Sequence, residues 1–256
     1  MFCKIELFPK KVIENDEVED LLWTFLNSLR NSGRILKKYS VVEGENYTLY
    51  VTLPKEDSFE EKYDNIYVKR DRAKIKKLFD YKLTVVGQNV ECSEYCCCKS
   101  RSAIEMQTYF ADINSIFTCC DCGKAIALYE VPYLDKQDDH YYLLSWQENF
   151  AAMDRLWYNG TYERYAAKQL VDPTSKLNKD GLEIAKQISS KMGCKVYYNI
   201  FDCLDFGKKI KFDDVDGIRL RVCPICGKTM KRKKFLEDYK VDVCEECSLT
   251  SECYKN

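Results

Sequence analysis

The sequence contains a single histidine, His140, so it has little material for imidazole-based chemistry. A catalytic triad needs an imidazole base with an acid and a nucleophile, and no such set can be assembled around His140. Its setting, Asp138-Asp139-His140-Tyr141, is typical of a loop. The ten glycines are scattered and form neither a phosphate-binding loop nor a dinucleotide-binding motif. We therefore expect that the protein is not an enzyme, and no small-molecule substrate is indicated.

An excess of charge and a long apolar run are also lacking. The 40 basic and 41 acidic residues give a net charge of -1, so any surface that attracts nucleic acid must be local. The apolar run Leu21-Leu22-Trp23 is far too short to cross a bilayer. The first residues show no apolar segment followed by a cleavage site, as a signal peptide would. We expect a cytoplasmic protein with no membrane partner.

Cysteine, in contrast, is abundant, with 15 residues, several of them in C-x2-C pairs. In a protein without a secretion signal this pattern favours metal ligation over disulfides. Because only one histidine is present, any zinc site must be built almost entirely from thiolates. The odd count leaves at least one thiol outside any fully paired scheme.

The C-terminal cysteines have the spacing C-x2-C-x17-C-x2-C, which is typical of a zinc ribbon. Two cysteines three positions apart on a tight turn place both sulfurs about 2.3 Å from a shared ion, and Gly227 relieves that turn. Four thiolates leave no open position, so the predicted site is structural. Unbound thiols or a dithiol redox site are the alternatives. The predicted ligands are Cys223, Cys226, Cys244 and Cys247, with Met230, Phe235, Leu236 and Tyr239 expected to cover the metal.

A second zinc site is predicted in the central cysteine cluster. Cys119, Cys122 and Gly123 repeat the C-x2-C-G turn, whereas the other pair has the less common spacing C-x-C. Cys97 and Cys120 are adjacent competitors, so the spacing leaves the ligands ambiguous. Reduced thiols and a redox-sensing cluster remain alternatives. The predicted ligands are Cys96, Cys98, Cys119 and Cys122, and Zn²⁺ is the expected cofactor, with one ion at the C-terminal site and a second here.

Apolar periodicity predicts an α+β fold with three parts. Residues 1–90 have the order β-α-β-β-α-β, which indicates a ferredoxin-like unit. Residues 91–215 form a cysteine-rich and helical domain, and residues 216–256 the C-terminal zinc ribbon. The predicted strands are Lys4–Phe8, Ile35–Val42, Tyr47–Leu53, Tyr81–Val86 and Val196–Phe201, and the predicted helices cover about 16–31, 67–79, 145–170 (one helix or two) and 179–192.

Basic residues gather in the C-terminal ribbon, where Lys231-Arg232-Lys233-Lys234 is predicted as the tip of a hairpin. Such a patch could hold phosphates in a salt-dependent manner, although a solvated hairpin face is an equal alternative. No recognition helix that would read bases is apparent. The candidate nucleic-acid contacts are Arg219, Arg221, Lys228, Lys231, Arg232, Lys233 and Lys234.

The order of these motifs resembles an uncharacterised group of prokaryotic zinc-ribbon proteins described as candidate nucleic-acid-binding proteins. The resemblance covers about residues 90–250 and includes the run CCDCGKAIALYEVP at 119–132, the motif LLSWQENF, the strand VYYNIF and the ribbon that begins CPICG. It implies zinc binding. One departure weakens its nucleic-acid implication, because the Tyr197-Tyr198 strand leads into the acidic Asp202-Cys203-Leu204-Asp205 and not into a basic, aromatic run.

Three functional hypotheses follow from the sequence. The first is a zinc-stabilised nucleic-acid-binding protein. The second is a protein-binding module, for example the immunity or inhibitor partner of a bacterial toxin, which suits the near-neutral charge and the 19 tyrosines. The third is a thiol-based redox sensor that uses the central cysteines.

Overall fold

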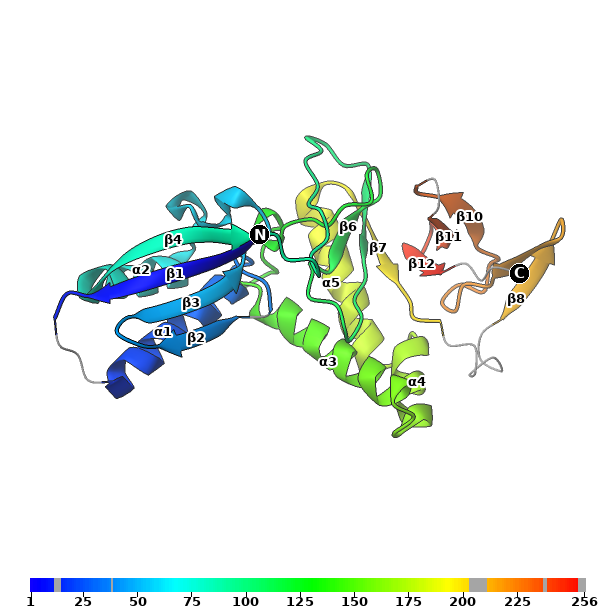
Figure 1. The fold of residues 1–256 in the computed structure, drawn as a ribbon. Coiled ribbons are helices and arrows are strands. Elements are labelled where there is room, and N and C mark those ends of the chain that lie inside the picture. Colours follow the sequence, from blue (N-terminus) through cyan, green and yellow to red (C-terminus); the bar gives the residue numbers. More distant parts are fainter. Residues whose placement is uncertain (12–14, 38, 203–210, 237–238, 253–256) are drawn as a thin grey trace. The chain divides into compact units, whose positions relative to one another are not determined.

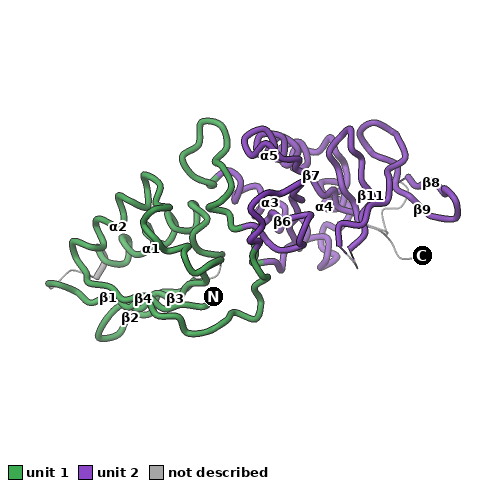
Figure 2. Tube along the Cα trace, turned by 90° about the horizontal axis from the view of Figure 1, so that it is seen from above, with its two compact units in different colours: residues 1–95, 113–115, 127–141 green, residues 96–112, 116–126, 142–256 purple. Residues whose placement is uncertain are grey.

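Helices and strands occur together in each of the two units into which the chain divides (Figures 1 and 2). The computed structural model describes residues 1–11, 15–37, 39–202, 211–236 and 239–252, so the predicted acidic start at 203–205 lies outside the described residues. Unit 1 contains residues 1–95, 113–115 and 127–141. Unit 2 contains residues 96–112, 116–126 and 142–256, and both predicted zinc sites lie within it. No described helix is long and apolar enough to cross a membrane.

Unit 1 is a four-stranded antiparallel sheet with two helices. Its strands lie in the order β2-β3-β1-β4, and β1 pairs with both β3 and β4. The central strand alternates between buried and partly exposed residues, because successive side chains of a strand point to opposite faces. The elements are β1 (Phe2–Pro9), α1 (Asn15–Asn31), β2 (Ser40–Glu43), β3 (Tyr47–Thr52), α2 (Ile66–Leu78) and β4 (Phe79–Gly87).

The core of unit 1 fills the space between this sheet and its helices. Cys3, Ile5 and Leu7 of β1 are completely buried in the same cluster as one face of α1. That helical face follows the spacing that the sequence predicts, since a stripe at 3.6-residue intervals must be removed from water. The buried apolar residues of α1 are Val18, Leu22, Phe25, Leu26 and Leu29.

The predicted strand Ile35–Val42 is wrong in its first half, because β2 begins only at Ser40. Ile35 and Leu36 are both buried, whereas consecutive residues of a half-exposed strand would alternate. Leu36 instead donates its backbone N–H to the carbonyl oxygen of Thr52 at 2.9 Å. The apolar run therefore enters the core directly after α1, and tertiary packing overrides its strand propensity.

His140 is buried in unit 1, just before α3 (Tyr141–Tyr158), and is only 1% exposed. Its ring lies 4.6 Å from that of Tyr133, and its backbone N–H donates to the carbonyl oxygen of Asn31 at 2.7 Å. Burial lowers the pKa of His140 to about 4, because a buried imidazolium loses its hydration. The imidazole is therefore neutral at physiological pH and part of the core.

Acidification should destabilise unit 1 through His140. The unfolded chain binds a proton near pH 6.5, whereas the folded chain does so only near pH 4, so this contribution is complete above pH 6.5 and is lost as the pH falls. Between pH 7 and pH 5 the free energy of unfolding of unit 1 should fall by roughly 2 kcal/mol. Hydrogen exchange of unit 1 amides measures this change separately from unit 2. The variant His140→Leu should show a flatter pH dependence, and an unchanged slope would contradict the assignment.

Unit 2 is built on a six-stranded mixed sheet in the order β10-β11-β12-β7-β5-β6. Strand β7 is parallel to both β5 and β12, and the other pairs are antiparallel. The sheet thus joins strands of the central cysteine segment to strands of the C-terminal cysteine segment. The strands are β5 (Ala103–Met106), β6 (Phe117–Cys119), β7 (Lys195–Asn199), β10 (Lys231–Lys234), β11 (Lys240–Cys244) and β12 (Leu249–Glu252), and β8 (Phe212–Val215) with β9 (Ile218–Arg221) forms a separate ribbon.

Helices pack on one face of this sheet. Tyr198 of β7 points toward them, with its hydroxyl donating to Asn178 at 2.6 Å and its ring 6.0 Å from that of Trp146. The opposite face carries Glu105 and Tyr197, which pair across β5 and β7. The helices are α3, α4 (Glu163–Val171) and α5 (Lys176–Met192), so the predicted helical segment 145–170 is two helices and the predicted helix at 179 begins three residues earlier, where Ser175 caps it.

The basic segment Lys231–Lys234 is a strand, not the hairpin tip that the sequence predicts. It pairs antiparallel with β11, and the turn begins only at Phe235, whose N–H donates to the carbonyl oxygen of Tyr239 at 3.0 Å. The side chains of a strand alternate between two faces, so the four basic residues do not form a single patch. The apolar residues that follow them occupy the tip instead.

Candidate metal centres

Two groups of four cysteine sulfurs converge in unit 2. In each group the four Sγ atoms lie within 4.8 Å of one another. One group joins the segment before β5 to the turn after β6, and the other joins the turn after β9 to the turn between β11 and β12. Each group contains two buried and two partly exposed cysteines. The groups are Cys96, Cys98, Cys119 and Cys122, and Cys223, Cys226, Cys244 and Cys247.

The sulfur positions fit a tetrahedral zinc ion. Cys226 Sγ and Cys244 Sγ are 3.7 Å apart. Four thiolates at about 2.3 Å from zinc would place each pair of sulfurs about 3.8 Å apart, whereas a disulfide needs about 2.05 Å. The set is thiolate only, which suits soft metals such as zinc. These residues could therefore hold a metal ion with no coordination position left for a substrate.

The first turns of the two groups share one local structure. Gly123 donates its N–H to the carbonyl oxygen of Cys119 at 2.8 Å, and Gly227 does the same to Cys223 at 2.9 Å. Both glycines have positive φ, 69° and 73°, a conformation that side chains with a Cβ adopt at a cost. The sequence C-x2-C-G thus sets the same turn twice, and each turn directs its two sulfurs to one side.

The C-x-C turn of the central group has a different spacing from the C-x2-C-G turns. Other hydrogen bonds therefore support its sulfurs. Cys96 Sγ accepts hydrogen bonds from the backbone N–H of Cys98 at 3.4 Å and from Arg101 Nε at 3.5 Å. Burial raises the pKa of Cys96, but these hydrogen bonds outweigh it and lower the pKa to about 7. Arg101 thereby stabilises a thiolate, the form that binds metal. In the sequence, only the position of Arg101 five residues after Cys96 suggests this role.

The structure separates the ligand set from its neighbouring cysteines. Cys97 is exposed and lies outside the group, although it stands between Cys96 and Cys98 in the sequence. Cys120 is buried in a different cluster, with Val241 and Val243 of β11. Its burial raises its pKa and keeps it a thiol. The two competitors that the spacing left open therefore lie outside the four-sulfur group.

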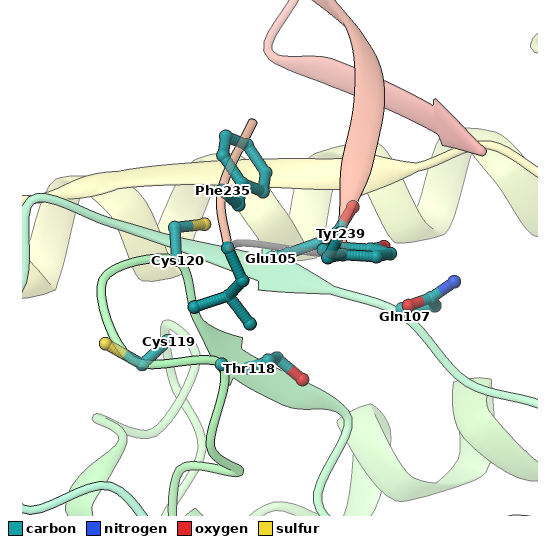
Figure 3. A pocket seen from close by; sticks show the side chains of 9 residues that line it. Glu105, Gln107, Thr118, Cys119, Cys120, Phe235 and Tyr239 are labelled. Carbon is teal, nitrogen blue, oxygen red and sulfur yellow. The ribbon is translucent and has the colours of Figure 1, made fainter. Parts of the chain in front are cut away.

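The apolar residues of the hairpin tip also lie elsewhere than predicted. The sequence predicts that Phe235, Leu236 and Tyr239 cover the C-terminal site, but they line a cavity beside Cys119 of the central group and its neighbour Cys120 (Figure 3). The hairpin carries its tip across the sheet to the other cysteine turn. Leu236, two positions after the basic strand, thus packs against Gly123, more than a hundred residues away along the chain, which spacing alone cannot reveal.

Arg221 and Arg232 are not free to contact a nucleic acid. Arg221 is 2% exposed and bonds Ser251 Oγ at 2.6 Å and Asp202 at 3.2 Å, so the prediction that it belongs to a basic surface patch is wrong. Arg232 forms an ion pair with buried Asp242 at 2.8 Å. Both arginines neutralise acidic residues that the fold has buried, because an unpaired charge there would be costly.

Two of the four lysines predicted to contact nucleic acid also form ion pairs. Lys228 pairs with Glu246, and Lys233 pairs with Glu245. Burial raises the pKa of Glu245, but hydrogen bonds from Lys195, Lys233 and Tyr197 prevail and hold it at about 2. Arg219 lies over the ring of Phe212, 4.2 Å from its centroid. Lys231 and Lys234 are exposed at the two ends of β10.

Comparisons with known proteins show similarity to domain families of unknown function. A family described as "Domain of unknown function (DUF2310)" matches residues 98–201, and one described as "Domain of unknown function (DUF8589)" matches residues 1–87. Two proteins of Haemophilus influenzae, both described as uncharacterized, are 29% identical over 110 residues, or 43% of this chain. The match spans only 51% and 40% of those relatives' own lengths. The chain is thus similar to uncharacterised prokaryotic proteins.

One solved structure, that of Rv0793 from Mycobacterium tuberculosis, is also similar to part of the chain. The match covers 35% of this chain and 97% of the other, with 12% identity and a TM-score of 0.29. A likeness of that size carries no argument about fold or function.

Proposed function

We propose that this chain is a zinc-binding protein in which two structural ions hold a binding surface in place. The observation that carries the proposal is the convergence of two separate sets of four sulfurs within 4.8 Å. Zinc bound there would supply folding free energy and no reactive position, because both sites are closed by protein thiolates. The protein would then act by binding a partner and not by catalysis.

We also propose a fold class for each of the two units. The element order β1-α1-β2-β3-α2-β4 and the strand order β2-β3-β1-β4 support a ferredoxin-like arrangement for the first unit. The two C-x2-C-G turns are each closed by an antiparallel bridge, Thr118 with Ala125 and Val222 with Thr229, which supports zinc ribbons in the second unit.

The partner that the surface favours is a protein. Four tyrosines of unit 2, on α3, α4 and the turn between them, are 44–75% exposed, and tyrosine is enriched at protein interfaces. A groove of about 220 Å³ lies among these helices, with Tyr142, Trp146 and Tyr165 in its walls. A bacterial toxin bound by this chain as its inhibitor is one such partner. The exposed tyrosines are Tyr142, Tyr158, Tyr162 and Tyr165.

Nucleic acid is the second candidate partner, and it rests on the exposed Lys231 and Lys234. The ion pairs of Lys228, Arg232 and Lys233 reduce the basic charge around them. A redox sensor is the third candidate, and it would need the sulfurs to pair with each other and not with a metal.

Native mass spectrometry of the full chain tests the proposal. We expect a mass increase of two zinc ions and no bound nucleic acid. The double substitution Tyr158→Ala and Tyr165→Ala should weaken the binding of a co-purifying protein partner. The double substitution Lys231→Ala and Lys234→Ala should leave that binding unchanged. Metal-free protein with disulfides would contradict the zinc proposal and favour redox sensing. Nucleic acid that is lost at high salt and in the lysine variants would replace the protein partner.

A further inference from the structure

A cavity of about 180 Å³ lies in unit 2 between the helix-free face of the sheet and the tip of the β10–β11 hairpin (Figure 3). Glu105 and Thr118 of the sheet contribute to one side, and Phe235, Leu236 and Tyr239 to the other. A cavity of about 150 Å³ is large enough to hold benzene. The space therefore suits a ligand the size of one ring with a short substituent.

Glu105 brings a carboxylate into this wall although it is only 1% exposed. Its Oε1 accepts hydrogen bonds from Asn199 Nδ2 at 3.0 Å and Thr250 Oγ1 at 2.5 Å, and its Oε2 accepts one from Tyr239 at 2.9 Å. All three donors are neutral, and no ion pair to Glu105 occurs among the described residues. Since a carboxylate offers about four acceptor positions, Oε2 retains capacity for another donor.

The surroundings of Glu105 favour a positive charge. Among the described residues that line the cavity there is no lysine, arginine or histidine. A second carboxylate, Glu252, accepts hydrogen bonds from Gln107, which lines the cavity, at 3.4 Å and from Tyr109 at 2.5 Å. The rings of Phe235 and Tyr239, 6.4 Å apart, present aromatic surface that attracts cations. Carboxylate, rings and apolar volume are the parts of a site for an ammonium group on an apolar body.

We propose that this cavity binds a small organic cation, a primary amine on a body of about one ring. The ammonium group donates to Glu105 Oε2, and the apolar body lies against Phe235 and Leu236. A purely structural role for Glu105, which would only tie Asn199, Thr250 and Tyr239 together, needs an acceptor but no charge. An experiment that varies the charge of the ligand therefore distinguishes the two roles. Its outcome does not depend on the partner proposed above.

The test compares benzylamine with benzyl alcohol, its uncharged analogue of similar size, by calorimetry on the full chain. We expect benzylamine to bind at least about tenfold more tightly, the difference that one charge-assisted hydrogen bond supplies. Equal affinities for the two compounds, or no binding of either, would overturn the proposal. This comparison uses the unaltered protein, so it does not depend on any variant folding.

Two variants locate the site. Glu105→Gln keeps an acceptor for Asn199 and Thr250 but removes the charge, so the preference for benzylamine should disappear. Thr118→Leu fills the cavity without touching those hydrogen bonds and should abolish binding, whereas the matched change Thr48→Leu, on the sheet of unit 1, should leave it intact. Retention of the amine preference in the glutamine variant, or of full affinity in Thr118→Leu, would refute the site. If the glutamine variant fails to fold, the leucine pair decides.

Discussion

Cys98→Ser should abolish tight zinc binding at the central site, whereas Cys97→Ser should leave both sites intact. The two cysteines are neighbours in one run, but only Cys98 has its sulfur in a four-sulfur group. Cys97 is exposed outside it. A serine hydroxyl does not replace a thiolate as a soft ligand, so one substitution opens the zinc shell. Structural zinc contributes about 10 kcal/mol or more to local folding, so this is the largest effect we expect from a single side chain.

Zinc retained after dialysis against a competing chelator measures this effect. The unaltered chain and Cys97→Ser should keep two ions, and Cys98→Ser should keep one. Cys226→Ser at the C-terminal site should also keep one, with faster hydrogen exchange in β10 and β11. Equal zinc content in the two neighbouring serine variants would show that the central ligands are wrongly assigned.

Gly123→Ala should destabilise unit 2 far more than Gly227→Ala, although both glycines occupy the same position of the same turn. Each has a positive φ, so alanine costs about 1–2 kcal/mol at either site. A Cβ on Gly227 would meet nothing within 4 Å, whereas one on Gly123 would lie 2.0 Å from Leu236 Cδ1. The side chain of Leu236 must then move and repack, which adds about 1–3 kcal/mol of overpacking. We expect a total near 2–5 kcal/mol for Gly123→Ala.

Urea unfolding of unit 2, followed by near-UV circular dichroism, measures the difference. The double variant Gly123→Ala with Leu236→Ala provides a control, because it removes the clash and should recover part of the stability. Similar losses in the two single variants would mean that the hairpin tip does not pack on the central turn.

The elements that the sequence predicts well are those whose apolar pattern is local. The buried face of α1 repeats at helical spacing, and the alternation in β1 matches a strand with one buried face. Ile35 and Leu36 break this logic, because they are buried by the core around them and not by membership of a sheet. A run of apolar residues reports burial, but not the backbone conformation that achieves it.

The basic residues of the C-terminal segment show that a local run of charge is an equally limited guide to the surface. A run of Lys and Arg predicts positive surface, yet Arg221 lies against Asp202 and Arg232 against Asp242. The acidic partners are ten or more residues away along the chain, so no local reading of charge finds them. The net effect is a surface far less basic than the sequence suggests.

The sequence by itself determined the C-terminal set of four cysteines and the two C-x2-C-G turns, because a turn of that spacing is closed by its own backbone hydrogen bonds. Only the tertiary structure decided which other central cysteines complete the four-sulfur group with Cys119 and Cys122. Cys96 and Cys98 reach the turn of Cys119 and Cys122 because the chain before β5 passes beside it, with the N–H of Cys96 bonded to the carbonyl oxygen of Ala125 at 2.7 Å. The fold also placed Glu105 under the hairpin tip, since the strands that surround it are up to 145 residues apart. The spacing of residues predicts the structure of a single turn, but only the packing determines which distant turns and strands meet.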